Sequence, residues 1–137
     1  MSAIAQTFST ASPSAPARGG PALLLRLEGL AAFAAALAAY AHDSGAWTMF
    51  AVLLLAPDLA MLGYLAGPRI GAAAYNLAHL YIAPLALAAA GSAFGAPTAI
   101  SLALIWIAHI GMDRALGYGL KYASGFSDTH LGRIGRA

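Results

Sequence analysis

The sequence contains no cysteine and very little charge. The absence of cysteine excludes disulfides, thiolate catalysis and cysteine-ligated zinc or iron–sulfur sites. Charged residues make up 9% of the 137 residues, whereas soluble domains carry about 25%. So few charges cannot cover the surface of a soluble protein of this size. The hydrophobic content of 61% therefore indicates a membrane protein.

The chain also lacks a marked excess of charge of one sign. Its formal net charge is +2, and its basic residues stand at the ends of apolar segments. This distribution indicates membrane topology and argues against nucleic-acid binding. Residues 1–21 are rich in Ser, Ala, Thr, Pro and Gly, with Arg18 as their one charged residue. They lack both the apolar core of a secretory signal and the several arginines of a transit peptide, so we expect a retained, disordered tail.

Four apolar segments follow, at about residues 22–41, 46–66, 70–90 and 98–120. Each has close to the roughly 20 residues that a helix needs to cross a bilayer. Backbone groups in lipid must be satisfied within the segment, which favours helices over strands. We therefore predict an all-α membrane protein with four transmembrane helices in an up-down bundle. A Gly-rich basic tail, residues 121–137, completes the chain.

Basic residues flank these segments on alternate turns. The turns at about 42–45 and 91–97 contain no Lys or Arg. With four spans, all remaining basic positions fall on one side, which the positive-inside rule makes cytoplasmic. Both termini are then expected in the cytoplasm. The basic positions are Arg18, Arg26, Arg69, Arg114, Lys121, Arg133 and Arg136.

Polar residues within the spans fall into one layer. At about 1.5 Å per residue from the cytoplasmic ends, Glu28 and Asn76 lie roughly 9 Å deep. By the same count Asp113 and Asp58 lie roughly 11 and 12 Å deep, and His79 and His109 roughly 14 and 17 Å. His79 and His109 are also equally far from the turn that joins their helices, which predicts that they are level. Ionisable residues inside a membrane are costly and mark a functional site by default.

Several chemistries fit this layer. Imidazole with carboxylate suits a divalent metal such as zinc, iron or manganese, and also acid–base work on a lipid-soluble substrate. The spacing of the residues matches no named metal motif. The candidate catalytic residues are Asp58, His79, His109 and Asp113, and the candidate metal ligands are the same four with Glu28.

Other interpretations stay open. His79 and His109 could be axial ligands of a haem or chlorin, or they could simply hydrogen-bond between helices of a non-catalytic accessory or assembly subunit. Asp58 could instead pair with Arg114, and Glu28 with Arg26 or Arg69. The sequence also leaves open whether the chain forms a homo-oligomer or joins a larger membrane complex.

Prolines, small residues and the tail predict local features. Pro57 and Pro84 free the carbonyls of residues 53 and 80, so each is expected to kink its helix. Small residues repeat every four positions at Gly63 and Gly67, and at Gly111, Ala115 and Gly119, which favours close helix packing. The C-terminal tail could fold over the bundle mouth and bring Asp128 and His130 to it. It could equally lie against anionic headgroups.

Several segments together resemble a small bacterial membrane-protein family that is designated only as a domain of unknown function, DUF4260. The resemblance covers about residues 24–136 and implies a four-helix protein of the bacterial inner membrane. It implies no activity, substrate or cofactor. The segments that carry it are LRLEG (25–29), APDLxMLGY (56–64), GPR (67–69), YNxAH (75–79), AHIGxDRALGYGLKY (108–122) and FxDTHLG (126–132).

The first prediction concerns topology. Because the basic flanks fall on one side of a four-span protein, reporter fusions at Ser44 and Phe94 should report a periplasmic location, and fusions at the C-terminus a cytoplasmic one. A periplasmic C-terminus would contradict the four-span prediction and the polar layer derived from it.

Overall fold

The computed structural model describes residues 16–43 and 45–135. Four helical stretches are long and apolar enough to cross a membrane: Gly20–Asp43, Trp47–Ala66, Pro68–Ala93 and Pro97–Leu116. The predicted four-helix membrane fold is thereby confirmed, and the protein is a multi-pass membrane protein. Of the tail expected to be disordered, residues 1–15 lie outside the described residues. Gly20 and Pro21 already form the start of the first helix, where proline is well tolerated.

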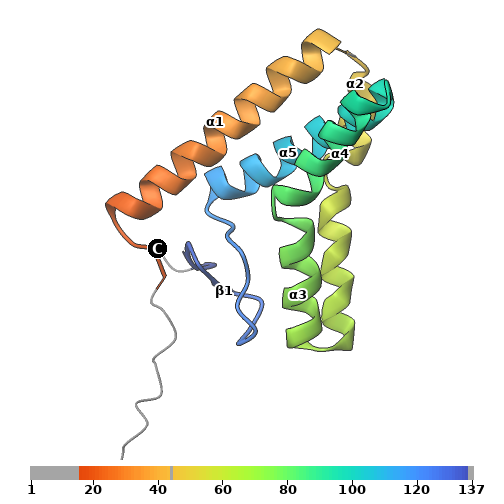
Figure 1. Ribbon diagram of the computed structural model, residues 1–137. Coiled ribbons are helices and arrows are strands. Elements are labelled where there is room, and N and C mark those ends of the chain that lie inside the picture. Colours follow the sequence, from red (N-terminus) through yellow and green to blue (C-terminus); the bar gives the residue numbers. More distant parts are fainter. Residues whose placement is uncertain (1–15, 44, 136–137) are drawn as a thin grey trace, which may run out of the picture.

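The first and fourth spans are the continuous helices α1 (Gly20–Asp43) and α5 (Pro97–Leu116), whereas the second and third spans are each broken. The second consists of α2 (Trp47–Leu53) and the 3₁₀-helix η1 (Ala56–Ala66). The third consists of α3 (Pro68–Ala78) and α4 (Ile82–Ala93). Figure 1 shows that η1 and α3 run side by side as a hairpin set at an angle to α1 and α5.

Each break lies beside a proline. In η1 the N–H of Asp58 donates to the carbonyl of Leu55 at 3.1 Å, a 3₁₀ bond, and Pro57 has no N–H to continue the ladder backwards. In the third span the helix stops at His79, and Pro84 lies in the first turn of α4. The kink expected from Pro84 is thus found about one turn earlier in the chain, at residues 79–81, next to the carbonyl that Pro84 leaves without a helical partner.

The fourth span ends at Leu116, four residues before the expected boundary at 120. Gly117 adopts φ +91°, a left-handed conformation that glycine reaches without strain. Its N–H and that of Tyr118 return to the carbonyls of the last turn at 3.1 and 2.8 Å. The chain beyond this cap turns back and forms two short antiparallel strands, β1 (Asp128–Thr129) and β2 (Gly132–Arg133).

The core lies where α1 and α2 pack on α5. Tyr40 is fully buried among Phe50, Ile105 and Ala108, and its hydroxyl donates to the carbonyl of Ala46 at 2.8 Å. Toward the other end of α1, Gly29 meets Gly111 so closely that a Cβ at either position would lie 2.8 Å or less from backbone atoms of the other helix. Of the predicted small-residue contacts, Gly111 therefore packs against α1 and Gly63 against α3, whereas a Cβ at Gly67 would meet nothing within 4 Å.

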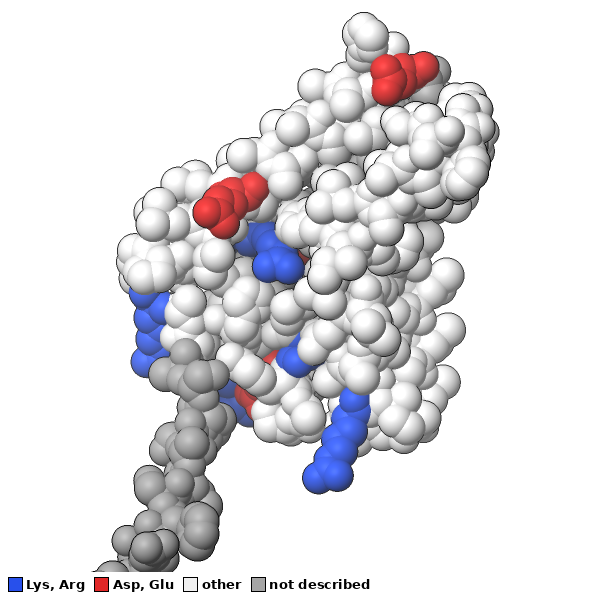
Figure 2. Space-filling view, in the orientation of Figure 1, with Lys and Arg blue, Asp and Glu red and all other residues white. Residues whose placement is uncertain are grey.

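The outer surface suits a lipid environment. Leu23, Leu24, Leu27 and Leu30 of α1 are each more than half exposed, as are Leu59, Leu62 and Leu65 of η1. On the face shown in Figure 2, the basic side chains lie in the middle and lower parts of the molecule, and most of the remaining surface is uncharged. The apolar bands on α1 and η1 are therefore placed to contact lipid.

A second prediction follows from the close contact of α1 with α5. The change Gly29→Ala places a methyl group 2.6 Å from the Cβ of Arg114 and 2.8 Å from the carbonyl oxygen of Gly111, so the helices must separate. Overpacking of this kind costs about 1–3 kcal/mol of folding free energy. Thermal unfolding in detergent should show a lower midpoint for this variant. Gly20→Ala, on the same helix but with nothing within 4 Å, is the matched control and should unfold like the parent.

Candidate metal centre

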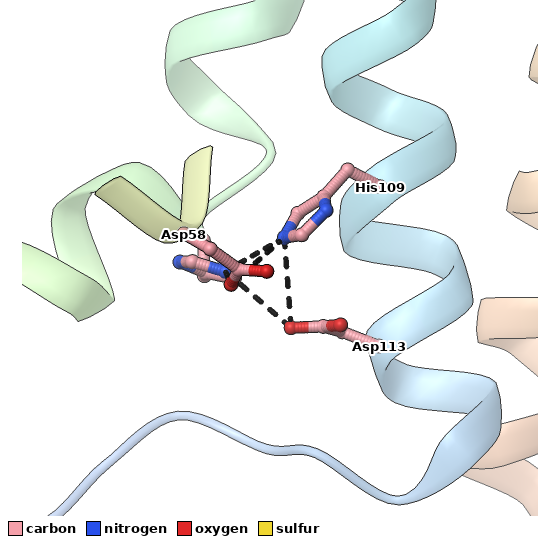
Figure 3. A group of neighbouring side chains, drawn as sticks. Asp58, His109 and Asp113 are labelled. Carbon is pink, nitrogen blue, oxygen red and sulfur yellow. Dashed lines mark hydrogen bonds and ion pairs between the residues drawn. The ribbon is translucent and has the colours of Figure 1, made fainter. Parts of the chain in front are cut away.

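Four of the predicted site residues meet at the two helix breaks. Asp58 stands in the first turn of η1, and His79 is the residue at which α3 ends. His109 and Asp113 lie four residues apart on one face of the unbroken α5. Figure 3 shows Asp58, His109 and Asp113 converging on one point, and one ligand atom from each of the four residues lies within 4.8 Å of all the others.

The distances between these atoms are short and similar. The Nε2 atoms of His79 and His109 are 3.0 Å apart. The Oδ1 of Asp58 lies 3.5 Å from each of these nitrogens. The Oδ2 of Asp113 lies 3.4 Å from that of His79 and 3.7 Å from that of His109. His79 and His109 were predicted to be level because they are equally far from the turn that joins their helices. In the structure their rings are in direct contact.

The cluster is enclosed. His109 is fully buried, and His79 and Asp113 are buried as well. Asp58 is the most accessible of the four, with 29% of its side chain exposed. The site therefore has three buried groups and one side that remains open.

Backbone contacts fix the tautomer of His79. Its Nδ1 lies 2.8 Å from the carbonyl oxygen of Tyr75, which can only accept, so Nδ1 carries the proton and donates. In the neutral ring Nε2 is then a lone-pair acceptor, and it is this atom that faces the cluster. His109 Nδ1 is buried and has no hydrogen-bond partner among the described residues.

Tyr75 organises the other side of the cluster. Its hydroxyl donates to Oδ2 of Asp113 at 2.9 Å. Its ring stacks on that of His79, with centroids 3.7 Å apart and planes 12° from parallel. Tyr75 thereby fixes both the carboxylate and the imidazole, as groups around metal ligands commonly do.

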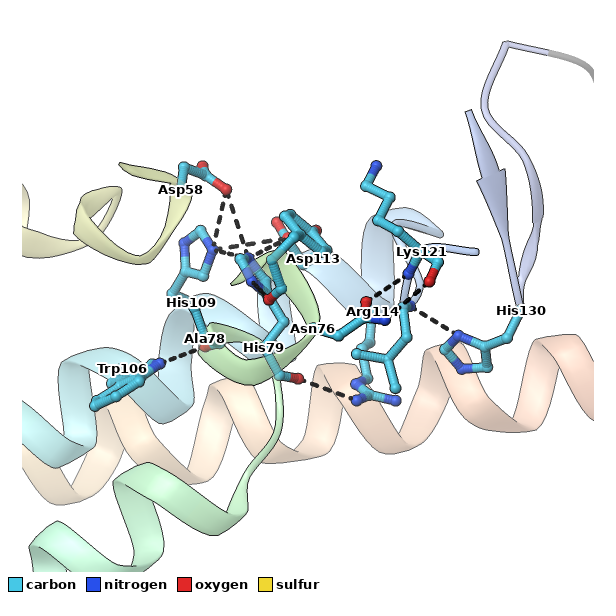
Figure 4. Close-up of polar contacts among 12 residues, drawn as sticks. Asp58, Asn76, Ala78, His79, Trp106, His109, Asp113, Arg114, Lys121 and His130 are labelled. Carbon is cyan, nitrogen blue, oxygen red and sulfur yellow. Dashed lines mark hydrogen bonds and ion pairs between the residues drawn. The ribbon is translucent and has the colours of Figure 1, made fainter. Parts of the chain in front are cut away.

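The C-terminal segment, residues 117–133, covers the cluster beyond the end of α5 and is called the covering segment below. The side-chain amide of Asn76 donates to the carbonyl of Lys121 at 2.8 Å and accepts from its N–H at 2.7 Å, so one side chain pairs with both backbone groups (Figure 4). Further along, the N–H of Leu120 donates to Nδ1 of His130 at 2.8 Å. The tail therefore folds back over the bundle, as one of the two expected arrangements requires.

Lys121 is the charged residue that this segment brings in. Its side chain is buried, and its Nζ lies 4.8 Å from the ring centre of Tyr75 and 3.8 Å from that of Phe126. Burial lowers the pKa of Lys121, an effect that the carboxylates of Asp113 and Asp58 oppose. The ammonium group thus lies on aromatic faces, close enough to the cluster to interact electrostatically with both carboxylates.

Other predicted residues lie elsewhere. Glu28 is exposed on α1 and is not among the residues that meet at the cluster. Arg114 donates to the carbonyl of His79 at 3.3 Å and lies over the ring of Tyr81. Within the described chain, no ion pair joins it to Asp58. Asp128 accepts from Ser124 and lies 3.6 Å from Arg133, at the surface.

Sequence reasoning missed the roles of Tyr75 and Lys121. Tyr75 stands four residues before His79, so helical spacing alone could have placed the two on one face. The place of Lys121 depends on the fold of the tail and on Asn76, for which the sequence carries no comparable signal.

A third prediction concerns pH and the covering segment. Burial lowers the pKa of His130, and the nearby Arg114 guanidinium lowers it further. An undocked segment takes up a proton near pH 6.5, whereas the docked one does so only at lower pH. The undocked form thus binds more protons in this window, so docking is complete above about pH 6.5 and weakens as the pH falls below it.

Hydrogen exchange of residues 117–133, corrected for intrinsic rates, should therefore increase several-fold between pH 7.5 and pH 5.5. The variant His130→Asn keeps an acceptor without a titrating ring and should lose this dependence. His42→Asn is the control, because His42 is 88% exposed and lies at the far end of α1. Equal pH dependence in parent and His130→Asn would contradict the prediction.

Comparison with known proteins identifies a family and adds no activity. No curated protein and no solved structure matches the chain. A family model described as "Domain of unknown function (DUF4260)" matches residues 22–134, which include all but the first two residues of the first span, the other three spans and every residue of the cluster. The chain belongs to the DUF4260 family.

Proposed function

We propose that this protein is an integral-membrane metalloprotein that binds one divalent transition-metal ion through Asp58, His79, His109 and Asp113. The observation that carries the proposal is the convergence of these four ligand atoms within 4.8 Å of one another. The bound ion would serve as a Lewis acid toward a lipid-soluble substrate, in an enzyme or a carrier.

The spacing of the ligand atoms supports this proposal. Nitrogen and oxygen ligands lie about 2.0–2.2 Å from zinc, so neighbouring ligands of a tetrahedral ion are about 3.3–3.6 Å apart. Here the two nitrogens are 3.0 Å apart, and the four nitrogen–oxygen distances run from 3.4 to 3.7 Å. Small movements would place all four atoms around one ion.

The hydrogen-bonding character of the cluster supports it as well. The lone pair of His79 Nε2 faces the carboxylate oxygens of Asp58 and Asp113, which also only accept. The other nitrogen beside it, Nε2 of His109 at 3.0 Å, could donate one N–H, which cannot satisfy all three acceptors. Acceptors brought together in a buried place require a shared cation or protons between them. A divalent ion would neutralise two carboxylates completely and satisfy both imidazoles.

The ligand set suggests the class of ion and its chemistry. Two imidazoles with two carboxylates suit zinc, iron or manganese rather than calcium or magnesium. Asp58 is partly exposed, which leaves a side from which water or a substrate group could reach the ion. A bound ion of this kind polarises a carbonyl or phosphoryl oxygen, or lowers the pKa of a bound water.

The geometry favours a small ion over a pigment or a purely structural role. Axial ligands of a haem or chlorin stand on opposite faces of a wide ring, roughly 4 Å apart across the metal. Here Nε2 atoms 3.0 Å apart share their space with two carboxylates. A purely structural role would pair each acceptor with its own donor, whereas here the N–H that His109 Nε2 could carry and the Tyr75 hydroxyl face three acceptors, Nε2 of His79 and the two carboxylates.

We also place the protein in the inner membrane of a bacterial cell, with both termini in the cytoplasm. The proposal is supported by the basic residues at one end of the spans. Arg26 donates to the carbonyl of Ala115 at the end of α5, Lys121 follows the end of that helix in the chain, and Arg69 lies in the first turn of α3. The metal centre would then lie in the cytoplasmic half of the bilayer. Self-association remains a separate proposal, to be tested by the mass of the detergent-solubilised complex.

A fourth prediction tests the metal centre. Elemental analysis of detergent-purified protein should find close to one zinc, iron or manganese ion per chain, and chelation should lower the unfolding temperature. His79→Ala, His109→Ala and Asp113→Asn each remove one ligand and should lose most of the bound ion. The controls are His42→Ala and Asp43→Asn, since these residues form an exposed His–Asp contact of 3.0 Å outside the cluster.

The double variant His79→Ala/His109→Ala adds a second criterion. If both rings hold one ion, the double variant should be about as unstable as either single variant, because the ion is already lost. Losses that simply add, in a parent without bound metal, would reject the shared centre and leave two independent packing residues.

A further inference from the structure

An apolar groove lies beside the proposed metal centre. It has a volume of about 410 Å³ and is lined by Leu53, Pro57, Ala78, Ile105 and Trp106 among others. Two of these residues directly precede Asp58 and His79 in the chain, and Trp106 is one turn before His109. The volume lies within the roughly 300–1,000 Å³ of small-molecule sites.

A hydrogen bond positions one wall of the groove. The indole N–H of Trp106 donates to the carbonyl of Ala78 at 2.6 Å, next to the break after α3. This bond ties α5 to the end of α3 and fixes one wall of the groove beside the cluster. The groove is therefore built from the same two helix breaks that bring the ligands together.

The groove, the cluster and Lys121 follow one another along α5 and the segment after it. Figure 4 shows Trp106 on one side of the cluster and Lys121 on the other, with His109 and Asp113 between them. An elongated molecule lying along this line would have an apolar end at Trp106 and a polar end at Lys121. This is the orientation of an amphiphile in the bilayer leaflet nearest the covering segment.

Charge balance in the metal-loaded site favours a bound anion. Two carboxylates balance a divalent ion, which leaves the buried positive charge of Lys121 without a counter-charge. Among the described residues no carboxylate lies within ion-pair distance of its Nζ, which contacts two aromatic faces instead. An uncompensated buried charge is costly, so an anionic group bound there would be stabilised by both the ion and the ammonium.

We propose that the ligand of the metal centre is an anionic amphiphile, whose hydrocarbon chain lies in the groove and whose phosphate or carboxylate head lies between the metal ion and Lys121. This inference rests on the proposed metal site and names its substrate class. It assigns to Lys121, the one lysine in the sequence, the role of binding the headgroup.

The test measures binding of matched amphiphiles to metal-loaded protein in neutral detergent. Dodecyl phosphate and dodecanoate are compared with dodecanol and with butyl phosphate, by ligand-induced thermal stabilisation, and metal content is determined in every sample. The two anionic long-chain probes should bind at least tenfold more tightly than either comparison probe. The two probes also distinguish phosphate from carboxylate as the preferred head.

Variants separate the two halves of the site. Lys121→Gln should weaken binding of the anionic probes roughly ten- to hundred-fold and leave the metal in place. Arg69→Gln, at an exposed basic residue in the first turn of α3, is its control. Ala60→Phe, which fills the groove, should weaken long-chain probes but not butyl phosphate. Ala66→Phe, at the exposed end of η1, is the control for added bulk.

The outcomes keep the two proposals apart. A metal-loaded parent that binds dodecanol as well as dodecyl phosphate, or a Lys121→Gln variant that keeps the preference for anions, overturns the amphiphile site and leaves the metal centre standing. A parent that never binds metal overturns the metal centre and, with it, this assignment of its ligand.

Discussion

The structure depends on bringing two carboxylates and two imidazoles together inside an apolar protein. Such groups are costly in a low-dielectric interior unless they compensate one another. The protein places His109 and Asp113 on an unbroken helix and brings Asp58 and His79 to them from two broken ones. Tyr75, Asn76 and the covering segment then supply hydrogen bonds around the cluster. The irregular parts of the fold thus lie where the polar side chains lie.

Breaks in membrane-spanning helices expose backbone groups that lipid cannot satisfy, so they occur where protein covers them. Here the carbonyls near the breaks have partners in the site. The carbonyl of Ala78 accepts from Trp106, that of His79 from Arg114 and that of Tyr75 from His79. The breaks therefore aim side chains at the cluster and also provide the acceptors that orient them.

Much of this arrangement could be predicted from the sequence, because its strongest signals are physical. Span length, basic flanks and the equal spacing of His79 and His109 from one turn depend on bilayer thickness and helical rise. The broken second and third spans were indicated by Pro57 and Pro84, although the exact position of the second break was not. The end of α5 at Leu116 depends on the conformation of Gly117, and the place of Lys121 on a tertiary contact with Asn76. Neither is encoded in a periodic pattern. Glu28 was included among the candidate metal ligands because of its depth, and depth alone does not show that its side chain is exposed on α1.

Asn76 lies on α3, and His79, three residues later, caps the end of this helix. Asn76 holds the covering segment, and His79 faces the proposed ion site. A short helix moves as a rigid body, so a rotation of α3 that withdraws the imidazole also pulls on Lys121. Access to the proposed centre and coordination of its ion by His79 would then be coupled through less than one turn of α3. The cover would be released when the ligand sphere opens, and it would be drawn closed when the sphere is complete.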